Sequence, residues 1–119
     1  MAKNTFDLLP GEAVIDTWTL LYIPPGGGKY NGRCTITNQR ILYDAKLDYS
    51  IKGLLEEFIY LKTGSEGYLA IPKSRISSIE TNKNFLDKRV ILTLDNGQRH
   101  AFSYGALNID RAAAAMAKR

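Results

Sequence analysis

The segment Asp95-Asn96-Gly97 constrains the fold of this chain most strongly, because it separates two short runs with the composition of β-strands. These runs extend from Arg89 to Leu94 and from Gln98 to Tyr104. Asn-Gly between two such runs is among the strongest local signals for a β-hairpin. The sequence therefore predicts an antiparallel strand pair in the C-terminal half.

Five further runs are rich in aromatic and β-branched residues and are bounded by turn residues. They are Val14 to Tyr22, Tyr30 to Thr37, Arg40 to Lys46, Tyr68 to Pro72 and Ile76 to Thr81. The second run alternates, with Tyr30, Cys34 and Ile36 on the side expected to be buried. Asn38-Gln39 predicts a tight turn, because Asn tolerates left-handed backbone angles. Seven strands at this spacing favour an antiparallel sandwich or barrel.

The character of the sequence changes after Tyr104-Gly105. The alanine-rich segment from Asn108 to Lys118 predicts one helix, with Asn108 or Asp110 available as its N-cap. Its expected apolar stripe consists of Leu107, Ile109, Ala112, Ala113 and Met116. A helix this short is marginal in water by itself, so we expect it to pack on the sheet. We expect Trp18, Phe102 and Cys34 in the core.

The stretch from Leu47 to Thr63 is less regular. Its apolar residues fit helical spacing, but Phe58 to Leu61 could equally form a strand that pairs with Tyr68 to Ile71. We favour a short helix or turn at Ile51 to Glu57, followed by that hairpin.

The chain has 119 residues, which is the usual size of one domain, so we expect a single domain spanning residues 1–119. Hydrophobic residues make up 45% of the sequence and charged residues 24%, as is typical of a globular protein. The only cysteine, Cys34, has no partner for an internal disulfide, which favours a reducing compartment. The first residues, MAKNTFDLLPGE, lack the apolar run of a signal peptide, and no later run reaches the roughly 20 residues of a spanning helix. We therefore expect a cytoplasmic protein, with peripheral attachment to a membrane as an alternative.

The loop Pro24-Pro25-Gly26-Gly27-Gly28-Lys29 looks at first like a phosphate-binding loop. A Walker loop would need Gly at the position of Ile23 and Ser or Thr at the position of Tyr30, and neither is present. No helix pattern follows, so a dinucleotide-binding turn is excluded as well. The two prolines lack the N–H that a sheet ladder needs, so we expect them to end the first strand and the glycines to connect it to the next.

Three segments resemble GRAM domains and related bacterial pleckstrin-homology-like (PH-like) domains. They are Leu9-Pro10-Gly11-Glu12, GRCTITNQRILY at residues 32–43, and YLAIPKSRISSIE at residues 68–80. The order and spacing of these segments, together with the terminal hairpin and helix, extend the resemblance over nearly the whole chain. It implies a strongly bent, seven-stranded antiparallel sandwich closed by the helix.

The resemblance also implies a candidate site for an anionic lipid headgroup. PH domains that bind phosphoinositides use the first inter-strand loop and basic residues on the second strand. Lys29 and Arg33 occupy comparable places, and Arg40 is a third candidate. The residue two beyond Arg33 is Thr35, so the paired basic pattern is broken. The net charge of +4 and the pI of about 9.2 are compatible with an anionic partner without requiring one.

The remaining polar residues give little support for catalysis. His100 is the only histidine, and with Cys34 as the only other soft ligand a zinc site lacks ligands. The serines at 74, 77 and 78 have no evident base, and nothing places the acidic pairs at 44 and 48 or at 56 and 57 about a cleft. We expect no enzymatic activity, no cofactor and no metal. We do not expect nucleic acid as a partner, because the basic residues are spread along the chain.

An apolar group in the middle connection is the other candidate surface: Ile51, Leu54, Leu55 and Phe58. It either covers an open end of the sandwich or forms a surface for self-association or a partner protein. We therefore expect a binding module that acts through protein–protein or self-association, with anionic lipid headgroups as the alternative ligand. The partner itself cannot be read from the sequence, because a fold does not determine a function.

Overall fold

The computed structural model describes residues 8–25, 29–44, 60–63 and 66–118, with only the backbone described for residues 60–63 and 66–68. The strands are β1 (Val14–Ile23), β2 (Tyr30–Thr37), β3 (Arg40–Asp44), β4 (Tyr60–Thr63), β5 (Glu66–Pro72), β6 (Ile76–Lys83), β7 (Lys88–Leu94) and β8 (Arg99–Ser103). A short 3-10 helix, η1 (Lys73–Arg75), connects β5 to β6, and the α-helix α2 (Asp110–Ala117) ends the described chain.

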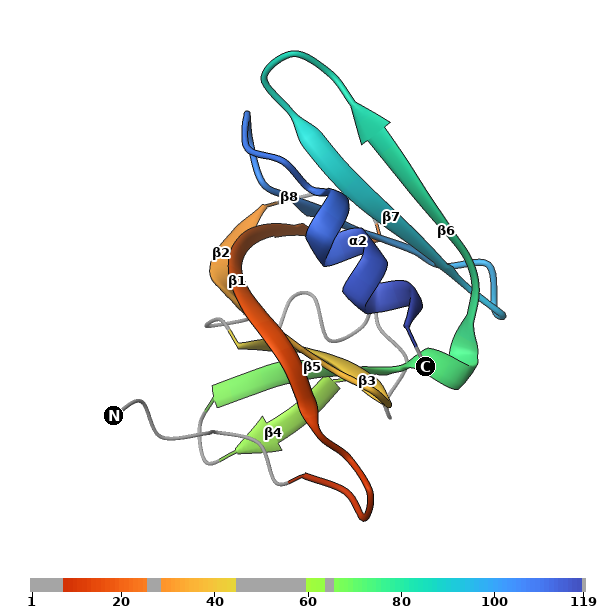
Figure 1. The fold of residues 1–119 in the computed structure, drawn as a ribbon. Helices are drawn as coiled ribbons and strands as arrows, with labels where there is room; N and C mark the ends of the chain where they lie inside the picture. Colours follow the sequence, from red (N-terminus) through yellow and green to blue (C-terminus); the bar gives the residue numbers. More distant parts are fainter. Residues whose placement is uncertain (1–7, 26–28, 45–59, 64–65, 119) are drawn as a thin grey trace.

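All described strands belong to one antiparallel sheet in the order β4-β5-β3-β2-β1-β8-β7-β6. The sheet is not closed, since β4 and β6 lie at its two ends. Figure 1 shows that the sheet bends strongly and that α2 lies across the opening between its two halves. The β6–β7 hairpin projects beyond the rest of the molecule at the top of this view.

The predicted fold class is confirmed: the protein is mainly β and antiparallel, with a C-terminal helix against the sheet. The described residues form eight strands rather than seven, because β4 pairs with β5 in the hairpin favoured for the middle connection. The helix or turn expected at 51–57 lies outside the described residues.

The core lies between the two halves of the bent sheet and against α2. Tyr22, Tyr43 and Phe102 have no solvent exposure and form an aromatic cluster with ring centroids 5.2–5.6 Å apart. Cys34 and Phe102 are buried as predicted, whereas Trp18 is half-buried at the border of this core.

The predicted turns occur, but one uses a different mechanism. Gly97 adopts φ +88°, and its N–H donates to Leu94 O at 2.9 Å, as expected of the Asn-Gly hairpin. At Asn38-Gln39, by contrast, no left-handed angle is needed, since positive φ among described residues occurs only at glycines. The Thr37 hydroxyl instead accepts hydrogen bonds from the N–H groups of Gln39 and Arg40 at 3.0 and 2.8 Å.

The helix has a shorter span and a slightly different buried face than expected. Ile109, Ala112, Ala115 and Met116 are buried, whereas Leu107, in the bend before the helix, is 59% exposed. The Asn108 side chain accepts a hydrogen bond from the Asp110 N–H at 2.8 Å, so Asn108 satisfies a free donor at the helix start.

Candidate functional site

The three predicted headgroup residues do not converge on one place. Lys29 and Arg33 are exposed, and Arg33 lies opposite Asp44 in the β2–β3 ladder. Arg40 begins β3, four residues from Asp44, so it lies about 13 Å further along the strand. Its side chain is 11% exposed and is bound to Glu12, which makes Arg40 part of the structural framework.

Glu12 and Arg40 form a buried, bidentate ion pair. The Arg40 Nε–H donates to Glu12 Oε2 at 2.9 Å, and its Nη2 donates to Oε1 at 2.8 Å. The Thr37 hydroxyl also donates to Oε2, at 2.6 Å. Hydrogen bonding to Arg40 is the main reason that the pKa of Glu12 is lowered to about 2, although burial acts in the opposite direction. This network fixes the segment before β1 to the β2–β3 turn.

Lys29 has a different neighbourhood. It is close enough to help lower the pKa of Asp87, although hydrogen bonds from Arg89 and Ser103 contribute more. Asp87 lies at the base of the β6–β7 hairpin tip, where it pairs with Arg89 and accepts a hydrogen bond from Ser103 Oγ at 2.6 Å. Lys29 therefore lies on the side of the molecule that carries this hairpin.

The tip of the β6–β7 hairpin exposes two large apolar side chains. Phe85 is 88% exposed and Leu86 is 70% exposed, the highest values among the exposed large hydrophobic residues of the described chain. Lys83 ends β6 just before the tip, and Lys88 begins β7 just after it. The Lys88 Nζ donates to the backbone oxygens of Phe85 at 3.3 Å and Ala106 at 3.1 Å, which ties the tip to the β8–α2 connection.

The strand signals in the sequence lie on either side of this tip and do not single it out as a site. The available signal was Asn84-Phe85-Leu86-Asp87, an apolar pair between two polar turn residues. A turn at that point forces the apolar pair outward, since strand pairing ends at Lys83 and Lys88.

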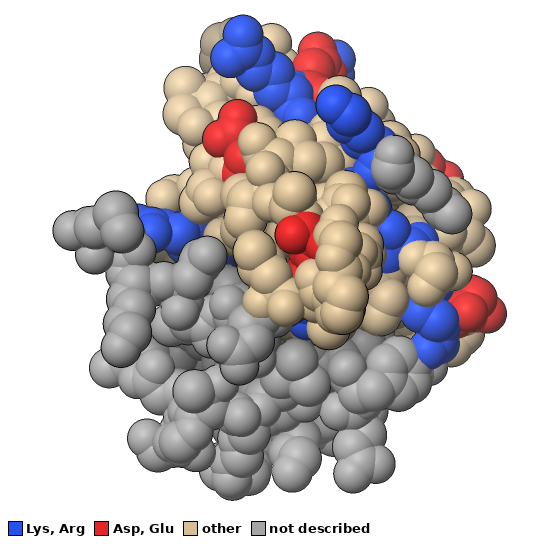
Figure 2. Space-filling model, turned by 60° about the horizontal axis from the view of Figure 1, so that its bottom comes forward, with Lys and Arg blue, Asp and Glu red and all other residues tan. Residues whose placement is uncertain are grey.

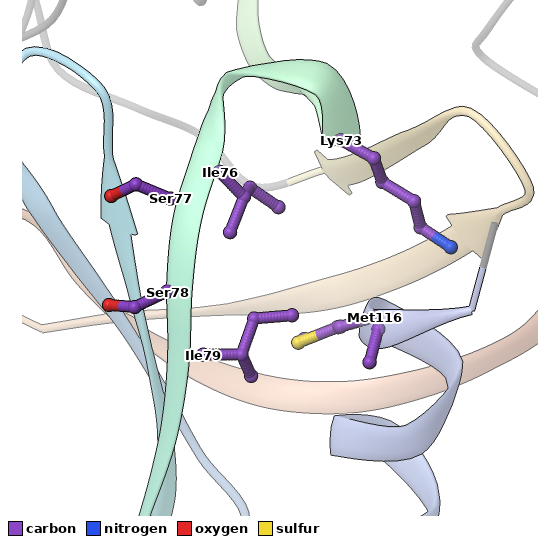
Figure 3. Close-up of a pocket in the computed structure, with 7 residues that line it drawn as sticks. Lys73, Ile76, Ser77, Ser78, Ile79 and Met116 are labelled. Atoms are coloured by element: carbon purple, nitrogen blue, oxygen red, sulfur yellow. The ribbon is translucent and has the colours of Figure 1, made fainter.

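A pocket of about 260 Å³ lies between β6 and α2. Figure 3 shows Ile76 and Ile79 of β6 pointing toward Met116 of α2, while Ser77 and Ser78 point away from the helix. The two adjacent serines share a side because the register shifts between Ile76 and Ser78. The pocket thus has an apolar floor.

Lys73 forms the inner end of this pocket. It is only 3% exposed, and its ammonium donates to Ala115 O at 2.7 Å and also to Lys118 O. These are carbonyl groups at the helix C-terminus that have no partner within the helix, and a cation there also interacts favourably with the helix dipole.

The only histidine lies in the interior. His100 has no solvent exposure, and its Nδ1 lies 2.7 Å from the Tyr22 hydroxyl. Burial raises the pKa of Tyr22, so the phenol keeps its proton and donates it to Nδ1. The Nε2 has no hydrogen-bond partner in the described part of the chain, and burial lowers the pKa of His100 to about 4.

The described residues contain no group of three or more His, Cys, Asp or Glu side chains that could hold a metal ion. Burial also raises the pKa of the Cys34 thiol, which makes it a poor nucleophile. In Figure 2, basic and acidic side chains are interspersed on the described part of the face in view, rather than forming a large area of one charge.

The proposed interaction surface at Ile51, Leu54, Leu55 and Phe58 lies outside the described residues and stays a prediction. None of the helices in the described ranges is long and apolar enough to cross a bilayer.

No family model matches this chain, and no curated protein matches it either. A solved structure, the C-terminal domain of an unknown protein from Leishmania infantum, is similar to it with a TM-score of 0.63. The similarity covers 90% of this chain and 83% of that one, at 15% sequence identity. At this identity the comparison supports the fold and carries no information about function.

Proposed function

We propose that this protein is a non-catalytic binding module that attaches reversibly to anionic membrane surfaces through the tip of the β6–β7 hairpin. The observation that carries the proposal is the exposure of Phe85 and Leu86 at a projecting tip, with Lys83 and Lys88 on either side. The resemblance to GRAM and bacterial PH-like domains supports a binding module in preference to an enzyme. A cytoplasmic location with peripheral attachment is consistent with this role.

The energetics favour weak, reversible attachment. Full burial of a Phe or Leu side chain contributes roughly 1.5–3 kcal/mol. A lysine near an anionic lipid surface contributes about 1 kcal/mol to the binding free energy. Salt screens this electrostatic contribution. Lys83 is 47% exposed beside Asp110, so its ion pair is worth little in water and can be exchanged for lipid phosphates.

A bilayer suits this tip better than a flat protein surface does. A standard protein interface buries roughly 800 Å² on each partner, and two side chains on a narrow turn cannot supply that area. A bilayer closes around a projecting side chain, with the apolar part in the acyl region and the cations at the headgroups.

Lys29 and Arg33 give a second candidate contact with the headgroups. Both are exposed, and the influence of Lys29 on Asp87 places it toward the hairpin. Lys29 could therefore meet lipid phosphates when the tip is inserted. This contact is tested separately from the tip.

The test is co-sedimentation with phosphatidylcholine vesicles, with and without phosphatidylserine. We expect the wild-type protein to bind the anionic vesicles and to dissociate at high salt. The double variant Phe85→Ser/Leu86→Ser should bind at least tenfold more weakly, and Lys83→Gln/Lys88→Gln several-fold more weakly. The matched control is Leu8→Ser/Leu9→Ser, which removes another exposed apolar pair, and it should bind like the wild type.

Two results would overturn the proposal: no binding of the wild type to anionic vesicles, or equal binding by the Phe85/Leu86 variant. A loss seen only in Lys29→Ala/Arg33→Ala would assign the membrane contact to the first inter-strand loop instead.

A further inference from the structure

β6 ends the sheet, and no described strand pairs with its outer edge. Such an edge presents unpaired N–H and C=O groups, which are a template for one more strand. The edge is partly protected, since β6 has a register shift at its start and carries Glu80 and Lys83. The register shift restricts regular strand addition to the segment from Ile79 to Lys83, and the two charged residues within that segment discourage non-specific pairing.

The backbone directions in this segment follow from the β6–β7 pairing. Asn84 N–H donates to Asp87 O at 3.2 Å, so these two residues form a hydrogen-bonded pair. Hydrogen-bonded and non-hydrogen-bonded pairs alternate in an antiparallel ladder. Asn82 and Glu80 therefore bond to β7, whereas the backbone groups of Ile79, Thr81 and Lys83 point to the free edge.

The side chains of the same three residues are on the α2 side of β6. Ile79 points toward Met116 in Figure 3 and lines the pocket between the two elements. Lys83 reaches Asp110 at the other end of the helix, with 2.6 Å between Nζ and Oδ1. A strand added along β6 would thus lie beside α2, with its inward side chains over the pocket.

The lining of the pocket indicates the chemistry of the ligand. At about 260 Å³ it is smaller than the roughly 300–1,000 Å³ of a site for a drug-sized molecule, so it suits one apolar side chain. The Lys73 ammonium is already bound to carbonyl groups at the helix end, so the accessible positive charge is that of exposed Lys118, which follows the helix. None of the lining residues is acidic. The charge is therefore complementary to an acidic group next to the apolar side chain.

We propose that β6 and α2 together bind an extended peptide segment of a partner protein, by strand addition along Ile79–Lys83. The segment places an apolar side chain in the Ile79–Met116 pocket and an acidic side chain toward Lys118. Main-chain hydrogen bonds supply affinity in this mode, and the pocket supplies specificity. This surface shares only Lys83 with the hairpin tip and does not depend on membrane attachment.

The test selects ligands from a displayed library of random linear peptides and measures the affinity of the enriched peptides for variants. Thr81→Pro removes an outward N–H from an edge strand, where proline is tolerated, and should weaken binding at least tenfold. Its matched control Thr81→Val keeps the N–H and should bind like the wild type. Ala117→Arg obstructs the pocket from an exposed helix position and should also weaken binding at least tenfold.

We expect the enriched sequences to combine an apolar residue with a nearby acid. The variant Phe85→Ser/Leu86→Ser should bind these peptides normally, and Thr81→Pro should bind vesicles normally, so that each proposal can fail alone. Failure to enrich any peptide, enriched sequences without an acid, or affinity unaffected by Thr81→Pro would overturn the peptide site. A dimer that Thr81→Pro dissociates would also overturn it, because a second copy would then occupy the edge.

Discussion

Arg40 is the residue for which a binding role and a structural role compete most directly. Its guanidinium could meet an anion, but it is already bound to Glu12, whose side chain has no exposure. Removing one member of a buried ion pair leaves the other charge uncompensated, which costs about 3–5 kcal/mol. We therefore expect Arg40→Met to lower the free energy of unfolding by about 3 kcal/mol or more in urea denaturation. A change below about 0.5 kcal/mol, typical of a surface substitution, would contradict this assignment.

Two buried residues with large pKa shifts contribute to the change of stability with pH. The pKa of His100 falls from 6.5 to about 4 on folding, so the unfolded chain binds more protons in that range. Stability should be complete above pH 6.5 and decrease by about 3 kcal/mol as the pH falls toward 4. The pKa of Glu12 falls from 4.5 to about 2, so its contribution is complete above pH 4.5 and is lost toward pH 2.

Urea denaturation at a series of pH values separates these two contributions. His100→Leu should remove the slope between pH 6.5 and 4 while keeping the loss below pH 4.5. The absolute stability of this variant will also change, because the Tyr22 hydroxyl loses its partner, so the slope is the diagnostic quantity. An unchanged slope would show that His100 is not the responsible group.

At the level of elements, α2 is held at its C-terminal end by a lysine from another part of the chain. Lys73 reaches the helix from η1 and binds carbonyl groups of its last turn. Hydrogen bonds to a charged group contribute roughly 1.5–3 kcal/mol, so we expect Lys73→Met to destabilise the protein by about 2 kcal/mol. In this variant, the exchange of backbone amide hydrogens should accelerate in the last turn of α2.

The comparison for this prediction is Lys83→Met, which removes a cation near the other end of the same helix. The Lys83–Asp110 pair is about half exposed, and such pairs contribute about 0–1 kcal/mol. Equal effects of the two substitutions on stability and on exchange would contradict the role assigned to Lys73.

Strands and helix could be predicted from sequence because their signals are local. The strand at Tyr30–Thr37 and the Asn-Gly hairpin depend on neighbouring residues, and both are confirmed. The expected alternation of burial holds only as far as Arg33, because Thr35 and Thr37 are buried as well. The Glu12–Arg40 pair could not be predicted, because it joins residues 28 apart through the β2–β3 turn. The pocket between β6 and α2 likewise requires knowing that the helix returns to the edge strand.

At the scale of the whole molecule, two proposed surfaces share one projecting arm. The tip of the β6–β7 hairpin is assigned to a lipid surface, and the free edge of β6 to a peptide. With the tip in a bilayer, the edge strand would start near the headgroups and extend away from them. The arrangement would let one domain hold a partner protein close to a membrane. The buried core fixes the position of the hairpin tip relative to the edge of β6.

The most direct test of the central claim is the depth of the tip in a bilayer. In Phe85→Trp, a tryptophan at the tip should shift its emission to the blue on anionic vesicles and be quenched by lipids with brominated acyl chains. Val14→Trp places the same fluorophore at an exposed position of β1, and its emission should neither shift nor be quenched. The natural Trp18 contributes the same background emission to both variants. Sedimentation with vesicles without quenching at position 85, or equal quenching in both variants, would contradict insertion of the hairpin tip.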